Sequence, residues 1–116
     1  MRSIFIMAAA LVLASANSSA QPVPHRADVM GPGTISCGKW IEQRREAGVV
    51  MYGSEDWVLG FLSSYNQYSS TDGRLTADID SEGAMTWLDN YCQAHPLDKL
   101  ITATTALVAE LEARRR

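Results

Sequence analysis

From residue 37 onward, apolar residues recur every three or four positions, a spacing typical of amphipathic helices. The clearest pattern follows Pro96, where steps of four and three mark one face of the chain, formed by Leu97, Ile101, Thr104, Val108 and Leu111. Proline suits the first turn of a helix, because the N–H that it lacks would have no partner there. The pattern predicts a helix that begins at Pro96 and ends near the arginines at 114–116, which complement the helix dipole.

A second helical pattern covers residues 81–94. Asp80 is a good N-cap, because its carboxylate can accept a hydrogen bond from the free N–H groups of the first turn. The expected inward face consists of Ala84, Leu88, Tyr91 and Cys92. This helix should end at His95, since a residue before proline avoids the helical backbone region.

Aromatic residues mark another helix, in which Trp57, Phe61, Tyr65 and Tyr68 share one face. Such a stripe predicts packing against the core. Ser54 is the expected cap, and apolar residues 49–52 should be a short connection packed on the core rather than a patch that faces a partner. Glycine in mid-helix costs about 1 kcal/mol relative to alanine, so we expect another element, such as a tryptophan, to approach Gly60 closely.

The first helix is predicted at residues 37–47, with Thr34 or Ser36 as its cap and Gly48 at its end. Its inward face carries Cys37, Trp40, Ile41 and Arg44. No stretch with the pattern of a convincing strand remains. The predicted fold class is therefore all-α, a bundle of four helices.

The first twenty residues have the pattern of a secretory signal peptide. Arg2 precedes an apolar run at residues 4–14, and small residues at 17–20 suit signal cleavage after Ala20. Prolines and glycines are dense at residues 21–34, which predicts a flexible leader without regular structure. We thus expect residues 35–116 to form one helical domain in the periplasm or outside the cell.

The net charge of this domain indicates which classes of partner it is expected to bind. Without its signal the chain carries 9 basic and 13 acidic residues, a net charge of −4. An acidic surface argues against nucleic acid as a partner. The absence of a long apolar span or a basic amphipathic helix from the sequence argues against a membrane partner.

The two cysteines, Cys37 and Cys92, both lie in the part expected to be exported. An even number in an oxidising compartment predicts a disulfide between them. The bond would close a loop of 55 residues and would stabilise the fold by about 4 kcal/mol on the chain-entropy model.

Candidate catalytic and metal sites are sparse. Asp89, Cys92 and His95 are three positions apart and suggest a thiol–imidazole pair with an orienting carboxylate, but a disulfide removes the nucleophile. A zinc site needs about four ligands, and Cys92 and His95 supply only two. No haem-attachment run or phosphate-binding loop is present. We therefore expect no catalytic residues, no metal, no cofactor and no enzymatic activity.

Three segments together resemble a known family. They are Cys37-Gly38-Lys39-Trp40, then Trp57-Val58-Leu59-Gly60-Phe61-Leu62-Ser63, then Trp87-Leu88-Asp89-Asn90-Tyr91-Cys92 followed by Pro96-Leu97. Their order is similar to that in Tai/Rap-type immunity proteins, which act against type VI secretion amidases. It also resembles the wider HdeA-like group of small periplasmic helical proteins with one disulfide. The resemblance implies a four-helix HdeA-like bundle and supports the bond between Cys37 and Cys92.

The resemblance implies a protein partner and leaves two functions open. An immunity protein would bind a peptidoglycan amidase and block its cleft with a protruding loop. Polar residues 69–80 form the longest expected loop, so its tip is the candidate partner-binding site: Thr71, Asp72, Gly73 and Arg74. The alternative is an HdeA-like acid-stress chaperone that opens at low pH and holds unfolded clients. A homodimer is compatible with either function.

Overall fold

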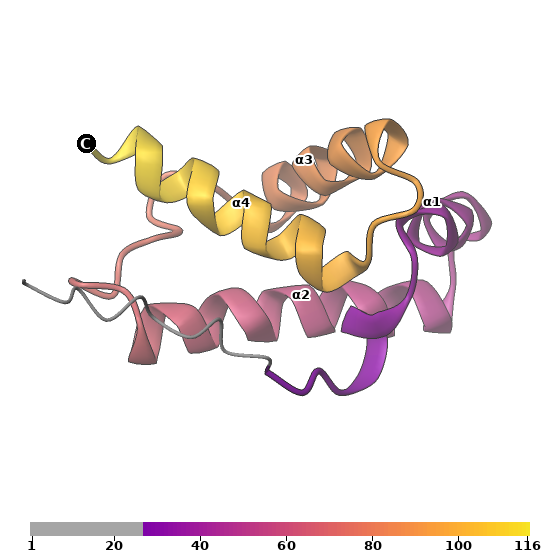
Figure 1. Cartoon of the computed structure of the whole chain (residues 1–116), viewed down its shortest axis with the longest axis horizontal. Helices are drawn as coiled ribbons and strands as arrows, with labels where there is room; N and C mark the ends of the chain where they lie inside the picture. Colours follow the sequence, from indigo (N-terminus) through magenta and orange to yellow (C-terminus); the bar gives the residue numbers. More distant parts are fainter. Residues whose placement is uncertain (1–26) are drawn as a thin grey trace, which may run out of the picture.

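Four α-helices enclose the core in the computed structural model, which describes residues 27–116 (Figure 1). They are α1 (Cys37–Glu46), α2 (Val49–Tyr68), α3 (Ser81–Ala94) and α4 (Leu100–Arg114). No strand occurs within these described residues, which confirms the all-α class. The predicted signal peptide at residues 1–20 lies outside the described residues, as do the first six residues of the predicted leader.

Side-chain caps begin two of the helices where the sequence predicted them. The Ser36 hydroxyl accepts a hydrogen bond from Lys39 N at 3.1 Å and starts α1. The Asp80 carboxylate accepts one from Gly83 N at 2.7 Å and starts α3. Each cap satisfies a backbone donor that the helix leaves free in its first turn.

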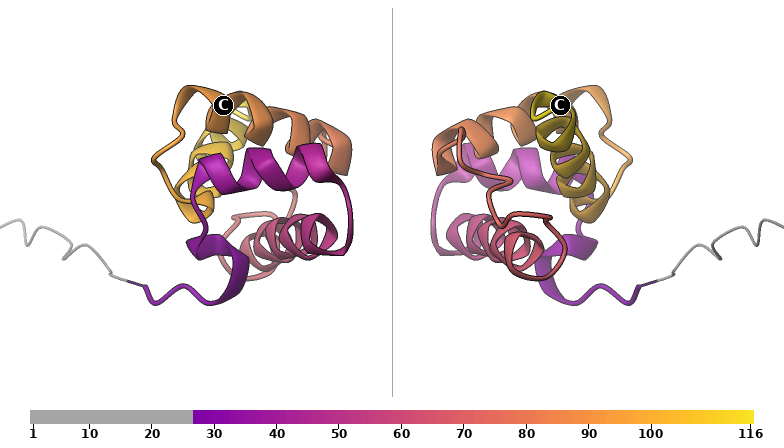
Figure 2. Two further views of the ribbon diagram at one scale, coloured as in Figure 1. Left: turned by 90° about the vertical axis from the view of Figure 1, so that its right-hand side faces the viewer. Right: turned by 90° about the vertical axis from the view of Figure 1, so that its left-hand side faces the viewer.

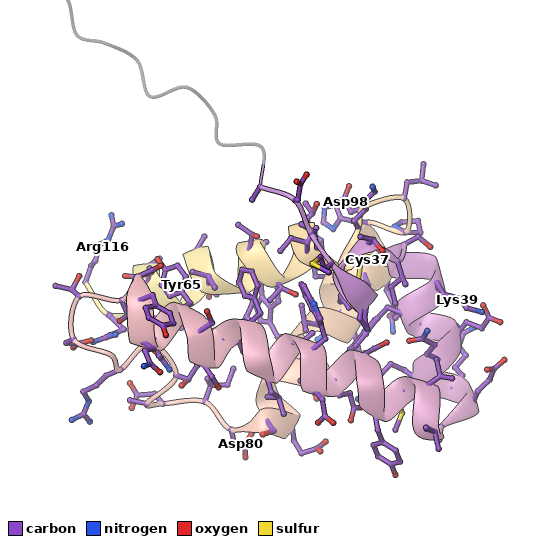
Figure 3. All side chains as sticks on the ribbon, turned by 90° about the horizontal axis from the view of Figure 1, so that it is seen from below. Cys37, Lys39, Tyr65, Asp80, Asp98 and Arg116 are labelled. Carbon is purple, nitrogen blue, oxygen red and sulfur yellow. A yellow bond between two sulfur atoms is a disulfide. The ribbon has the colours of Figure 1, made fainter. Side chains whose placement is uncertain are left out.

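The predicted disulfide is present between Cys37 and Cys92. It joins the beginning of α1 to the last turn of α3, and both cysteines are fully buried. Nearby backbone bonds add to this junction: Cys37 N donates to Asp98 O at 2.7 Å, and Gly38 N donates to Pro96 O at 3.0 Å. Figure 3 shows Cys37 beside Asp98 accordingly.

Helix α2 begins six residues before the predicted start, so residues 49–52 are its first turn and not a connection. The chain reverses between α1 and α2 within two residues, Ala47 and Gly48, both with positive φ. Ser54, the expected cap, is instead buried and donates a hydrogen bond to Gln43 Oε1 at 2.7 Å. The expectation that residues 49–52 pack on the core is also wrong, because Val49, Val50 and Tyr52 are exposed.

The core-facing stripe of α2 consists of Ser54, Val58 and Leu62 rather than of its aromatic residues. Trp57, Phe61 and Tyr65 flank this stripe half-buried, and Tyr68 is 81% exposed. Two stripes with the same four-residue spacing lie side by side on one helix, so spacing alone does not identify the inner one. Trp40 of α1 is fully buried and fills the core instead.

The predicted close approach to Gly60 is wrong as well. Gly60 is exposed, and a Cβ atom there would meet no heavy atom within 4 Å. The glycine that a tryptophan does cover is Gly33, where a Cβ atom would overlap the indole ring of Trp57.

Gly33 belongs to a 3₁₀ helix, η1 (Gly31–Thr34), within residues predicted to lack regular structure. We call residues 29–35 the N-terminal strap. The strap runs alongside α2 and also contacts α4 (Figure 2). Two hydrogen bonds attach it: the Trp57 indole N–H donates to Met30 O at 2.9 Å, and Leu100 N donates to Ile35 O at 2.9 Å. The composition of the leader therefore did not predict its packing.

Helix α4 begins at Leu100, four residues after the predicted start at Pro96. Residues 96–99 form a turn, in which Asp98 N donates to His95 O at 3.1 Å, and Leu97 is 94% exposed. The buried face of α4 includes the predicted Thr104, Val108 and Leu111, but Leu100, Ala103 and Leu107 complete it in place of Leu97 and Ile101.

Candidate functional site

The polar loop at residues 69–80, which we call the 69–80 loop, is held at its base by two residues. Leu75 is 2% exposed and belongs to the core. Asn66, on the last turns of α2, accepts a hydrogen bond from Leu75 N at 2.8 Å and donates one to Thr76 Oγ1 at 2.9 Å. A loop tied to its flanking helix in this way presents its tip in a defined position.

The loop tip contains the four residues predicted to bind a partner. Thr71, Gly73 and Arg74 are exposed, as is Asp72. Asp72 accepts a hydrogen bond from Arg74 N at 3.1 Å across a tight turn in which Gly73 has a φ of 68°. A positive φ of this kind favours glycine, so the sequence correctly placed a turn here.

Arg115, just after the end of α4, completes the tip. Its guanidinium forms an ion pair with the Asp72 carboxylate, and this hydrogen bond lowers the pKa of Asp72. The sequence predicts for Arg115 only that it complements the helix dipole. The two residues are 43 positions apart, and no local pattern indicates such a pair.

Together these residues form the loop-end surface, which we define as residues 71–74 with Arg115 and Arg116. Figure 3 labels Arg116 at one end of the molecule and Lys39 at the other. A shallow pocket of about 210 Å³ lies between Thr71, Asp72, Glu112 and the two arginines. The loop-end surface is therefore polar, carries both signs of charge and can offer hydrogen bonds of both kinds.

The opposite end of α2 carries a different surface, the α1–α2 corner, which we define as Val49, Val50 and Tyr52. Their side chains are 87%, 67% and 59% exposed. Large apolar side chains that gather in the open often mark a contact with another molecule.

A half-buried ionic cluster joins α1, α2 and α3. Arg44 donates to both carboxylate oxygens of Asp89, from Nε at 3.0 and 3.1 Å and from Nη2 at 3.0 Å, and it also pairs with Glu55. The indole N–H of Trp40 donates to Asp89 Oδ1 at 2.8 Å. The hydrogen bonding to Asp89 is the main reason why the pKa of Arg44 is raised. We call these four residues the Arg44 cluster.

Asp89, Cys92 and His95, the residues considered as a catalytic set, each interact with a different partner. The sulfur of Cys92 is bonded to Cys37, and Asp89 belongs to the Arg44 cluster. His95 is exposed, and its Nδ1 lies 2.9 Å from Tyr91 O. The geometry therefore does not connect them as nucleophile, base and orienting acid.

Within residues 27–116, no three His, Cys, Asp or Glu side chains gather as a candidate metal site. Across the same residues, no helix combines the length and the apolar character needed to cross a membrane.

Comparison with known proteins does not identify the chain. No protein-family description matches it, and neither does any curated protein or solved structure.

Proposed function

We propose that this chain is an exported binding protein of immunity type, which inhibits a peptidoglycan amidase by placing the 69–80 loop in its cleft. The observation that supports this function is the fixation of a long polar loop at its base by Leu75 and Asn66. The loop exposes its tip while its base is part of the core. This arrangement holds the side chains of the tip in one conformation, which suits a loop that inserts into a cleft.

The fixed base matters because binding is opposed by the entropy of ordering the groups at the interface. Asp72 is held by Arg115 and by the backbone of Arg74, so the ordering cost of the tip is reduced before any partner arrives. The exposed groups include a carboxylate, a hydroxyl and guanidinium groups, so the tip can both donate and accept hydrogen bonds in a polar cleft.

The test is inhibition of peptidoglycan hydrolysis by a panel of purified type VI amidases. We expect the oxidised protein to inhibit at least one of them. The double substitution Asp72→Ala with Arg74→Ala should weaken that inhibition by about 30-fold or more, the effect of losing a hot spot worth about 2 kcal/mol. Both side chains are exposed, so the base of the loop and the fold should stay intact.

The matched control is Val49→Ser with Val50→Ser, a pair that is also exposed and lies at the opposite end of α2. It should change inhibition by less than about threefold. Equal losses in the two double variants, or no inhibition of any amidase in the panel, would contradict the proposal.

A second function, that of an acid-activated chaperone, is favoured by the Arg44 cluster. Two carboxylates, Asp89 and Glu55, connect three helices through one arginine. Acid that neutralises these two carboxylates would leave Arg44 as a half-buried charge without its partners. Loosening of the helices would expose apolar surface while the disulfide limits expansion.

The comparison that separates the two functions uses the Asp72→Ala, Arg74→Ala variant in both assays. Suppression of client aggregation at about pH 2–3 but not at pH 7, unchanged by the loop substitutions, would favour the chaperone function. Inhibition of an amidase at neutral pH, lost in the same variant, would favour the immunity function.

A further inference from the structure

An apolar groove lies beside the N-terminal strap and is separate from the loop-end surface. The strap, α2 and α4 form its walls, and its volume is about 810 Å³. Its lining includes Val29, Met30, Trp57, Phe61, Ile101 and Thr105. Sites that hold small molecules or protruding side chains have volumes of about 300–1,000 Å³ and apolar walls of this kind.

Two aromatic rings form one wall of the groove. Trp57 and Phe61 stack with their ring centroids 5.7 Å apart and their planes at 30°. The indole N–H already donates to Met30 O, so it makes no demand on a ligand for a hydrogen bond. Because Gly33 is packed against the same indole, the position of the ring is set by the fold. The wall is therefore a preorganised apolar surface, which suits contact with an apolar side chain.

One carboxylate contributes charge to the described lining of the groove. Asp28 is the only charged residue in the lining that the structure describes, and no ion pair of Asp28 occurs within residues 27–116. The same residues contain 13 acidic and 8 basic side chains, so the net charge of the described domain is negative as well. A ligand with a positive charge next to its apolar group would be complementary to this groove.

We propose that the groove docks a segment of a protein partner in which a large apolar side chain is flanked by lysine or arginine. The apolar side chain would pack on Trp57 and Phe61, and the cation would lie near Asp28. Met30, which is 84% exposed, would be covered by the same segment. Because the groove and the loop-end surface share no residue, this proposal holds whether or not the loop inhibits an amidase.

The probe is a capped ten-residue peptide with one phenylalanine between two lysines in a glycine and serine background. It is titrated to about 5 mM into the ¹⁵N-labelled oxidised protein, because a single anchored side chain gives millimolar affinity. We expect saturating shifts of the Trp57 indole N–H and of the amides of residues 28–30, 101 and 105. A peptide with glutamates in place of the lysines should bind about fivefold more weakly, as expected for an exposed charge pair.

Two substitutions on α4 make the test specific. Thr105→Phe fills the groove from an exposed position whose hydroxyl bonds only to its own helix, at Ile101 O, so the fold should be kept and the peptide shifts lost. The matched control is Thr102→Phe, the same change at an exposed threonine of the same helix that is not part of the lining, and it should bind the peptide like the parent protein. Asp28→Asn should remove the preference for the lysine peptide.

Each other outcome overturns the proposal. Shifts confined to the loop-end surface, equal binding of the lysine and glutamate peptides, or unchanged binding by Thr105→Phe would each do so. Concentration-dependent shifts of the groove amides without peptide, combined with no response to the lysine peptide, would assign the groove to a second copy of this chain instead.

Discussion

The two ends of α2 contrast in what they expose. At its beginning, an apolar run forms the α1–α2 corner, with side chains that face solvent. At its end, the polar 69–80 loop contains Leu75, which is buried almost completely. The average polarity of each segment thus predicts the wrong degree of burial for its most important residues.

The difference arises from how the chain turns at each end. Between α1 and α2 the reversal takes only Ala47 and Gly48, so the first turn of α2 extends past the core. After α2 the chain must return across the end of the bundle to α3, and that longer path brings Leu75 over the core. Burial in this domain is decided by the path of the chain, and one apolar residue within a polar loop can belong to the core.

The largest expected effect separates the two ends directly. Leu75→Ala should lower the free energy of unfolding by about 2–4 kcal/mol, because it removes buried methyl groups and leaves a cavity. Val50→Ala at the corner should change it by less than about 0.5 kcal/mol. Urea unfolding followed by tryptophan fluorescence measures both, and similar losses in the two variants would refute the contrast.

A smaller effect is expected at the second residue that fixes the loop. Asn66→Ala removes the hydrogen bond that Asn66 accepts from Leu75 N and the one that it donates to Thr76 Oγ1. The loss should lower the free energy of unfolding by about 1–2 kcal/mol. Hydrogen exchange of the Leu75 amide should accelerate more than exchange in α3. If both accelerate equally, Asn66 would be supporting the whole domain rather than the loop.

Gly60 lies between the two ends of α2, and a substitution there is expected to raise the free energy of unfolding rather than lower it. Because nothing lies within 4 Å of a Cβ atom there, Gly60→Ala should raise the free energy of unfolding by about 0.5–1 kcal/mol through helix propensity. Gly33→Ala is the control, and it should destabilise the protein because Trp57 occupies the space. A loss of stability in Gly60→Ala would mean that another group approaches this face after all.

The smallest effect concerns the pH dependence of the loop tip. Arg115 lowers the pKa of Asp72 in the folded protein, so their interaction is present above the ordinary aspartate range and is lost as pH falls through the lowered pKa. In Arg115→Gln the Asp72 carboxyl should titrate at higher pH than in the parent protein, as measured by carboxyl ¹³C NMR. An unchanged titration would show that the ion pair is not maintained in solution.

Local signals predicted the parts of the fold that depend on neighbouring residues. Asp80 marked the start of α3, and Pro96 marked its end. The disulfide followed from two cysteines and a secretory pattern. Ser36, one of the two caps considered for α1, starts that helix. Each cap or helix end is set by residues within a few positions of it. The disulfide could be predicted because two cysteines allow only one pairing.

The errors have a common physical origin in contacts between distant residues. A Ser-Glu-Asp run at Ser54 has the pattern of a helix cap, but Gln43 of α1 binds that serine. Residues 29–34 of the strap have the composition of a leader, but the Trp57 indole donates a hydrogen bond to Met30 O and so fixes them on α2. The Asp72–Arg115 pair likewise joins segments that no sequence period relates. Local propensity was overridden at these points by tertiary packing.

Both ends of the described chain lie at surfaces proposed here to bind partners: Ala27 lines the groove, and Arg116 lines the loop-end pocket. A purification tag or fluorescent protein fused directly after Arg116 would crowd the loop tip, and a bulky label attached close to residue 27 would crowd the groove. The two fusions therefore act as steric blocks of different surfaces. An attachment point at exposed Gln93, on α3, keeps a label off the residues that line either one.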